Sequence, residues 1–144
     1  MSADRKRDVV RGYLEDADAD LEMAELGAHA GNRLAAFHAQ QAAEKLVKAV
    51  RAYYELRLTS SHDIDELVNG NEYERIEPIP VEDKWRARLL PFAKLTQYAT
   101  AFRYPSPTGR RKAAPMDAVG EDISALRALR FEMAEQLLSE DRPK

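Results

Sequence analysis

The stretch from Arg33 to Leu56, RLAAFHAQQAAEKLVKAVRAYYEL, decides the fold. Its apolar residues recur every three or four positions, which is the spacing that lines up one face of an α-helix. One stripe holds Ala35, Ala39, Ala42, Leu46, Ala49 and Tyr53, widened by Ala36, Ala43, Val47, Val50 and Tyr54. A helix that is apolar around most of its circumference is packed by neighbours on several sides. The sequence therefore predicts a central helix here.

Helical spacing of apolar residues recurs in three further segments. These run from about Arg5 to Ala28, from Glu82 to about Phe102, and from about Met116 to Ser139. Pro91 interrupts the second of them, and because proline disrupts a helix we expect a kink or a short break just before it. No stretch shows the sustained two-residue alternation of a β-strand.

A short extra helix is predicted over residues 62–68. The run Thr-Ser-Ser at 59–61 supplies N-cap candidates, and Asn-Gly-Asn at 69–71 ends the helix. The prediction is therefore an all-α fold: an up-and-down bundle of four long antiparallel helices with one additional short helix.

Length and composition indicate one domain of 144 residues, with a core over about 5–138 and a proline-containing loop over about 103–115. The chain has no cysteine, which excludes disulfides, thiolate metal sites and a thiol nucleophile. No apolar run approaches the ~20 residues of a membrane span and no signal-peptide core follows the start, so the cytoplasm is the expected location. The Glu-x-x-His pattern of di-iron bundles and glycine-rich phosphate loops are both absent, so we expect no metal and no cofactor.

Charge is segregated along the chain. The net charge of −3 argues against a general nucleic-acid coat, which would carry a basic excess. A local basic group nevertheless lies within the long loop, and acidic residues are concentrated in 15–25 and 63–83. The basic group comprises Arg103, Arg110, Arg111 and Lys112.

Three segments together resemble the HEPN family of prokaryotic helical bundles. The first is FHAQQAAEKLVKA at 37–49, which is similar to the signature second helix of that family. The second is His-Asp-Ile at 62–64 followed by Glu-Leu at 66–67, and the third is Arg-Tyr-Pro at 103–105. The resemblance covers roughly residues 5–138.

The resemblance implies a bundle of four to five helices that is commonly a homodimer. It also implies a genetic neighbour, because genes of this family often stand beside a small nucleotidyltransferase in pairs that behave as toxin and antitoxin. Several branches are metal-independent endoribonucleases that use an arginine and a histidine separated by four to six residues. Other branches serve as binding or accessory modules.

Arg57 and His62 fit that spacing and are the candidate catalytic pair. Histidine titrates in the range useful for accepting a proton from a ribose 2′-hydroxyl, and a guanidinium donates to phosphate oxygens in a forked geometry. The active antitoxin-paired branch has a tyrosine two residues after the histidine, where this chain has Ile64. The alternative is that His62 caps or packs the start of the short helix.

Arg103 and Tyr104 are the second candidate site, for nucleotide or RNA. A guanidinium beside an aromatic ring can hold a phosphate and stack a base, and the loop residues Arg110, Arg111 and Lys112 would add positive charge. The alternative is that Arg103 pairs with a carboxylate of the central helix and that the loop cations are only solvated.

A polar strip interrupts the apolar central helix. It includes Gln41, Glu44, Lys45 and Lys48. Such a strip lines a groove between helices, forms the seam of a dimer, or makes an internal salt-bridge network.

Three hypotheses about function follow. The first is a HEPN protein that binds nucleotide or RNA as the toxin-like or accessory half of a nucleotidyltransferase-paired module. The second is a metal-independent endoribonuclease, and the third is a structural module that makes only protein contacts.

Overall fold

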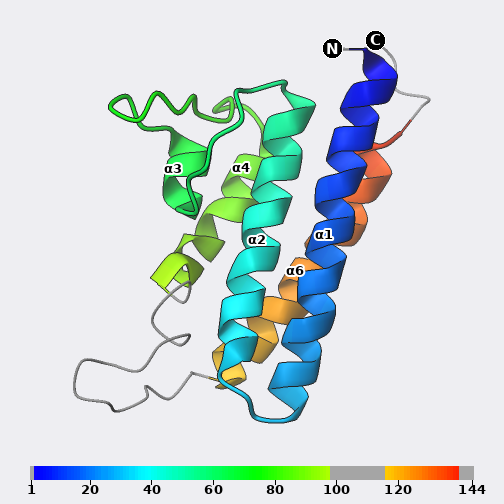
Figure 1. Cartoon of the computed structure of the whole chain (residues 1–144), viewed down its shortest axis with the longest axis vertical. Coiled ribbons are helices and arrows are strands. Elements are labelled where there is room, and N and C mark those ends of the chain that lie inside the picture. Colours follow the sequence, from blue (N-terminus) through cyan, green and yellow to red (C-terminus); the bar gives the residue numbers. More distant parts are fainter. Residues whose placement is uncertain (1, 98–115, 140–144) are drawn as a thin grey trace.

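The computed structural model describes residues 2–97 and 116–139, and 74% of it is helical. The long helices of the described residues are α1 (Ala3–His29), α2 (Leu34–Tyr53) and α6 (Met116–Leu137), labelled in Figure 1. Between α2 and α6 come α3 (Ile64–Asn69), α4 (Lys84–Leu89) and the 3₁₀ helix η1 (Leu90–Gln97). The predicted all-α class is confirmed. The fourth long helix of the predicted bundle is instead divided into α4 and η1, and its expected end near Phe102 lies outside the described residues.

The predicted central helix is α2. In Figure 1 it lies between α1 on one side and α3 with α4 on the other, and its most extensive packing is against α1. Thirteen of its residues are buried, most of them alanine, leucine or valine. Gly27 of α1 allows a close approach there, because a Cβ at that position would lie 3.2 Å from the Cβ of Ala35.

The break before Pro91 is confirmed. α4 ends at Leu89 and η1 begins at Leu90, as expected where a proline ring excludes the preceding α-helical turn. The buried residues of the two elements are Trp85, Leu89, Phe92 and Leu95. The apolar residues at helical spacing in α6 are also buried: Val119, Ile123, Leu126, Leu129, Met133 and Leu137.

The short helix begins two residues later than predicted, at Ile64, and its N-cap is an aspartate rather than a residue of 59–61. The Asp63 carboxylate accepts from the backbone N–H groups of Asp65 and Glu66. The Ser61 hydroxyl instead accepts from the backbone N–H of Asp63 and donates to the Glu66 carboxylate. The serine therefore braces the capping residue and does not cap the helix itself.

A tight turn follows α3. Asn71 and Ile76 exchange two backbone hydrogen bonds of 2.9 Å each, forming an isolated antiparallel bridge. The Asn71 side chain accepts from the backbone N–H groups of Tyr73 and Glu74, which fixes the turn from inside. Residues 71–76 are called the 71–76 turn below.

Candidate functional site

One buried arginine holds the connection between α2 and α3 in place. Arg51 of α2 is 4% exposed and donates to three backbone carbonyls. Its Nη1 donates to the carbonyls of Leu67 (2.9 Å) and Glu77 (2.5 Å), and its Nη2 donates to that of Arg57 (3.2 Å). Burial lowers the pKa of Arg51, and the charge of the Glu77 carboxylate acts in the opposite direction. Because a guanidinium carries five donors in a fixed plane, a single side chain ties three segments to α2. These are residues 56–63, called the 56–63 loop below, the helix α3 and the chain at Glu77.

His62, near the end of this loop, is bound to a buried carboxylate of α2. Its Nδ1 lies 2.9 Å from Oε1 of Glu44. The Glu44 side chain is 2% exposed, whereas the His62 side chain is 68% exposed. Because an ionised carboxylate only accepts hydrogen bonds, Nδ1 is the donor in this contact. The neutral imidazole then keeps its lone pair on Nε2, the other ring nitrogen of a largely exposed side chain.

The remaining polar residues around Glu44 bind it or each other. Lys48 donates to Glu44 Oε2 at 3.2 Å, and Gln40 donates to Oε1 at 3.3 Å. The Gln40 amide also lies 3.3 Å from the backbone carbonyl of His62, and Gln41 donates to the Gln40 side-chain oxygen at 2.8 Å. The buried carboxylate is thus surrounded by donors, as a charge of low exposure requires.

Lys45, one turn before Lys48, belongs to a second cluster that reaches α1. It donates to Asp20 Oδ2 at 3.1 Å, and His38 Nδ1 lies 3.5 Å from Asp20 Oδ1. The structure therefore divides the polar strip between two carboxylates, one on α2 itself and one on α1. These contacts lie within one chain, and a groove or a dimer seam at the strip stays a prediction.

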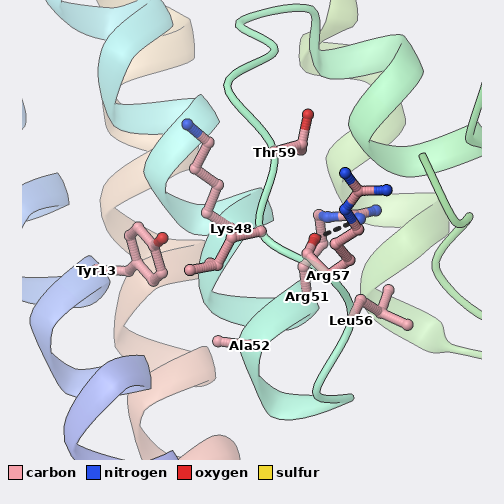
Figure 2. Close-up of a pocket in the computed structure, with 8 residues that line it drawn as sticks. Tyr13, Lys48, Arg51, Ala52, Leu56, Arg57 and Thr59 are labelled. Atoms are coloured by element: carbon pink, nitrogen blue, oxygen red, sulfur yellow. Dashed lines mark hydrogen bonds between the residues drawn. The ribbon is translucent and has the colours of Figure 1, made fainter. Parts of the chain in front are cut away.

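Arg57 lies on the same loop as His62 and is exposed. No ion pair or hydrogen bond of its guanidinium occurs among the described residues, and none joins it to His62. Figure 2 shows a small pocket beside it, with Tyr13 and Lys48 on one side and Leu56 and Arg57 on the other. Its free volume is about 10 Å³, roughly the space of one water molecule, so it cannot hold a nucleotide.

The second candidate site lies outside the described residues, which end at Gln97 and resume at Met116. This applies to Arg103, Tyr104, Arg110, Arg111 and Lys112. Their contribution to nucleotide or RNA binding stays a prediction.

Two residues of the site were missed by the sequence analysis. Gln40 was not among the candidate site residues, although it links Glu44 to the backbone of the 56–63 loop. Arg51 was not a candidate either, and the structure buries it beneath that loop. The available signal was its position between Val50 and Ala52 in the most apolar helix, where a charged residue requires internal partners.

No group of three or more histidine or acidic side chains that could hold a metal ion occurs in the described part of the chain. Among the same residues, no helix combines the length and apolar character that crossing a membrane requires.

Comparison with known proteins identifies the family. The family model described as HEPN domain matches residues 10–140, which is nearly the whole chain. No curated protein and no solved structure shows significant similarity. The matched region contains α2, the 56–63 loop and the short helix α3, the elements that hold Glu44 and His62 together. The chain therefore belongs to the HEPN family of nucleotide- and RNA-related helical modules.

Proposed function

We propose that this chain is the nucleotide- or RNA-binding half of a two-component module whose other half is a small nucleotidyltransferase. In this role it acts as the toxin-like or accessory component, and as a homodimer. Family membership supports the nucleotide or RNA part of the proposal. The pairing with a nucleotidyltransferase comes from the resemblance of its sequence segments to the family.

The observation that carries the proposal is the exposed pair of nitrogen-bearing side chains on an anchored loop. The 56–63 loop exposes the Arg57 guanidinium and the His62 imidazole, while Arg51 and Glu44 hold the loop from beneath. A guanidinium and an imidazole both donate to phosphate oxygens. A loop fixed at two points loses little conformational entropy when it binds a ligand, which favours binding.

Binding of ATP and of a fluorescein-labelled 12-nucleotide oligouridylate to the full chain tests this proposal. We expect Arg57→Ala and Arg103→Ala each to weaken binding about tenfold, as the loss of a charged hydrogen bond does. Arg11→Ala is the matched control, because Arg11 is a half-exposed arginine of α1 that pairs with Asp8 of the same helix. Absence of binding by the wild type in every oligomeric state would leave the third hypothesis, a module for protein contacts.

A second candidate function, a metal-independent endoribonuclease, is favoured by the contact between Glu44 and His62. An imidazole whose Nδ1 donates to a carboxylate keeps Nε2 available to accept a proton from a ribose 2′-hydroxyl. Arg57, on the same loop, would donate to the phosphate oxygens and stabilise the negative charge that develops during cleavage.

Cleavage of a mixed RNA pool in EDTA tests the second candidate. We expect cleavage by the wild type and its loss in His62→Ala. His38→Ala is the control, since His38 also has its Nδ1 near a carboxylate, that of Asp20. Loss in both variants, or no cleavage by the wild type, would count against the enzymatic role and leave the binding role.

A further inference from the structure

Arg57 also lines a second and larger cavity. It has a free volume of about 280 Å³ and is bounded by the 56–63 loop and the 71–76 turn. Seven residues line it: Arg57, Leu58, Thr59, Ser60, Glu74, Arg75 and Ile76. We call it the Arg57–Arg75 cleft.

Two guanidiniums and two hydroxyls make the lining suitable for an anion. Arg57 and Arg75 are both exposed, and neither guanidinium has an ion-pair partner within the described ranges. Thr59 Oγ1 accepts one hydrogen bond, from the backbone N–H of Ser61, so its hydroxyl proton is left to donate. Paired arginines with hydroxyl donors are the groups that proteins use to bind phosphate oxygens.

Arg75 is held in an unfavourable backbone conformation at this position. Its φ of 56° is left-handed, a region that residues with a Cβ rarely adopt. The Asn71–Ile76 bridge and the Asn71 side chain hold the turn that imposes this conformation. Strained residues are concentrated at ligand-binding and active sites. Arg75 combines such strain with a cation that has no ion-pair partner among the described residues.

Two exposed apolar side chains belong to the two segments that form the cleft. Leu58, which lines it, is 73% exposed, and Tyr73, one residue before Glu74 in the turn, is 98% exposed. A volume near 280 Å³ is just below that of pockets for drug-sized ligands, which start at roughly 300 Å³. The cleft therefore suits a phosphate with part of a ribose, and the base would lie outside against Leu58 and Tyr73.

We infer that the Arg57–Arg75 cleft binds the phosphate of a nucleotide, free or within single-stranded RNA, and that Tyr73 stacks on the adjoining base. Arg57 and Arg75 donate to the phosphate oxygens, together with Thr59. The Glu74 carboxylate repels a bare phosphate, but it accepts from a ribose hydroxyl or a base amino group. The inference rests on the proposed function and adds to it a defined subsite.

The test measures binding of AMP and of the labelled oligouridylate to the full chain. Arg75→Gly is the main variant, because glycine adopts a left-handed φ without strain and the turn therefore keeps its shape. We expect it to weaken binding of at least one probe about tenfold. For the RNA, the slope of log affinity against log salt should also fall by about 0.7, the value for one lost phosphate contact with a single strand.

Further variants separate charge, stacking and folding. Arg75→Lys should keep part of the affinity, Tyr73→Trp should keep it, and Tyr73→Ala should lower it about fivefold or more. Glu74→Gln should tighten RNA binding, because it removes a negative charge from the lining. Arg11→Ala again serves as the control, since α1 lies on the far side of α2 from α3 (Figure 1).

The outcomes distinguish the cleft from the broader proposal. If the wild type binds both probes and Arg75→Gly binds them equally well with an unchanged salt slope, the cleft is wrong and the proposed function stands. If the wild type binds neither probe, both the proposed function and the cleft are overturned.

Discussion

Nδ1 of His62 lies 2.9 Å from Oε1 of Glu44, although the two residues are 18 positions apart and differ greatly in exposure. The contact joins the 56–63 loop to the middle of α2. It gives the exposed imidazole a fixed orientation, because the carboxylate can only accept and the ring must therefore donate from Nδ1. The same carboxylate neutralises the Lys48 ammonium, so it has both a structural role and a role in orienting His62.

Glu44→Gln should therefore change both stability and the state of His62. The amide keeps the shape of the side chain but loses the charge that Lys48 and His62 face, and we expect a loss of about 1–3 kcal/mol in the free energy of unfolding. The ¹⁵N shifts of the His62 ring should move away from the Nδ1–H tautomer. Urea denaturation and imidazole NMR measure the two effects.

Asp20→Asn is the comparison for that variant. Asp20 also faces a lysine and a histidine, but its side chain is 19% exposed and its histidine contact is 3.5 Å. A more exposed pair contributes less, about 0–1 kcal/mol. Equal losses for the two variants would mean that the burial of Glu44 has no special energetic consequence.

Arg51→Lys should destabilise the chain in spite of keeping the charge. One ammonium cannot reach three carbonyls that approach a planar guanidinium from different directions, so at least two carbonyls lose their charged donor. We expect a loss of about 3 kcal/mol, since each hydrogen bond to a charged group contributes roughly 1.5–3 kcal/mol. Urea denaturation gives the magnitude, and faster amide exchange at Leu56 and Ile79 should locate it.

Arg57→Ala is the control for the Arg51→Lys variant. Arg57 accepts from Arg51 through its backbone carbonyl and not through its side chain. The exposed Arg57 side chain can therefore be removed without changing that hydrogen bond. We expect a change within about 0.5 kcal/mol. A large loss in this variant, or none in Arg51→Lys, would contradict the assignment of loop anchoring to Arg51.

Helix positions were predictable from the sequence because burial follows a local rule. The apolar spacing of α2 and α6 identifies their buried faces, and the glycine at 31 marks the turn between α1 and α2 with a φ of 67°. The break at Pro91 follows from the geometry of one residue. These features depend on residues within a few positions of each other, and periodicity reports them directly.

The contacts that build the candidate site join residues that are far apart in the sequence, and they were not predictable from it. Glu44 and His62 were each singled out, but nothing local indicates that the loop returns to α2 at that height. Arg51 binds backbone carbonyls 6, 16 and 26 positions away. Because every residue has a backbone carbonyl, the residue type does not reveal which of them accepts a hydrogen bond. The Arg57–Arg75 cleft likewise requires the 71–76 turn to approach the 56–63 loop.

Ionisation of Tyr54 should lower the free energy of unfolding at alkaline pH. Its pKa is raised by burial first, then by the hydrogen bond to Asp83 and by the negative charges of Asp83 and Glu82. The folded state therefore keeps the phenol proton above pH ~10, where the unfolded chain releases it. Stability from this group is complete below pH ~10 and declines as the pH rises beyond it. Urea unfolding at several pH values between 7 and 11 measures the decline.

Tyr54→Phe should show a shallower alkaline decline and a lower stability at pH 7, by about 1 kcal/mol, because the bond to Asp83 is lost. That carboxylate also caps α4 by accepting from the N–H groups of Trp85 and Arg86. Tyr73→Phe, at a 98% exposed position, should follow the wild-type curve. An unchanged alkaline slope in Tyr54→Phe would exclude Tyr54 as the group responsible.

Two glycines with left-handed φ should differ in their tolerance of alanine. Gly70 has a φ of 82° and a ψ of 169°, a region that only glycine commonly occupies, and an added Cβ would lie 2.8 Å from the Ile76 carbonyl oxygen. Gly31 has a φ of 67° with no atom within 4 Å of an added Cβ. We expect Gly70→Ala to cost about 3 kcal/mol and Gly31→Ala about 1 kcal/mol.

The difference arises at the base of the 71–76 turn, because the clash at Gly70 pushes against one of the two hydrogen bonds between Asn71 and Ile76. Urea denaturation of both variants measures the two costs, and amide exchange at Ile76 should be faster in Gly70→Ala alone. Equal costs would mean that the turn moves away from the added methyl group without loss. In that case the turn would be too compliant to hold Arg75 at its left-handed φ, and the fixed geometry of the Arg57–Arg75 cleft would lose its support.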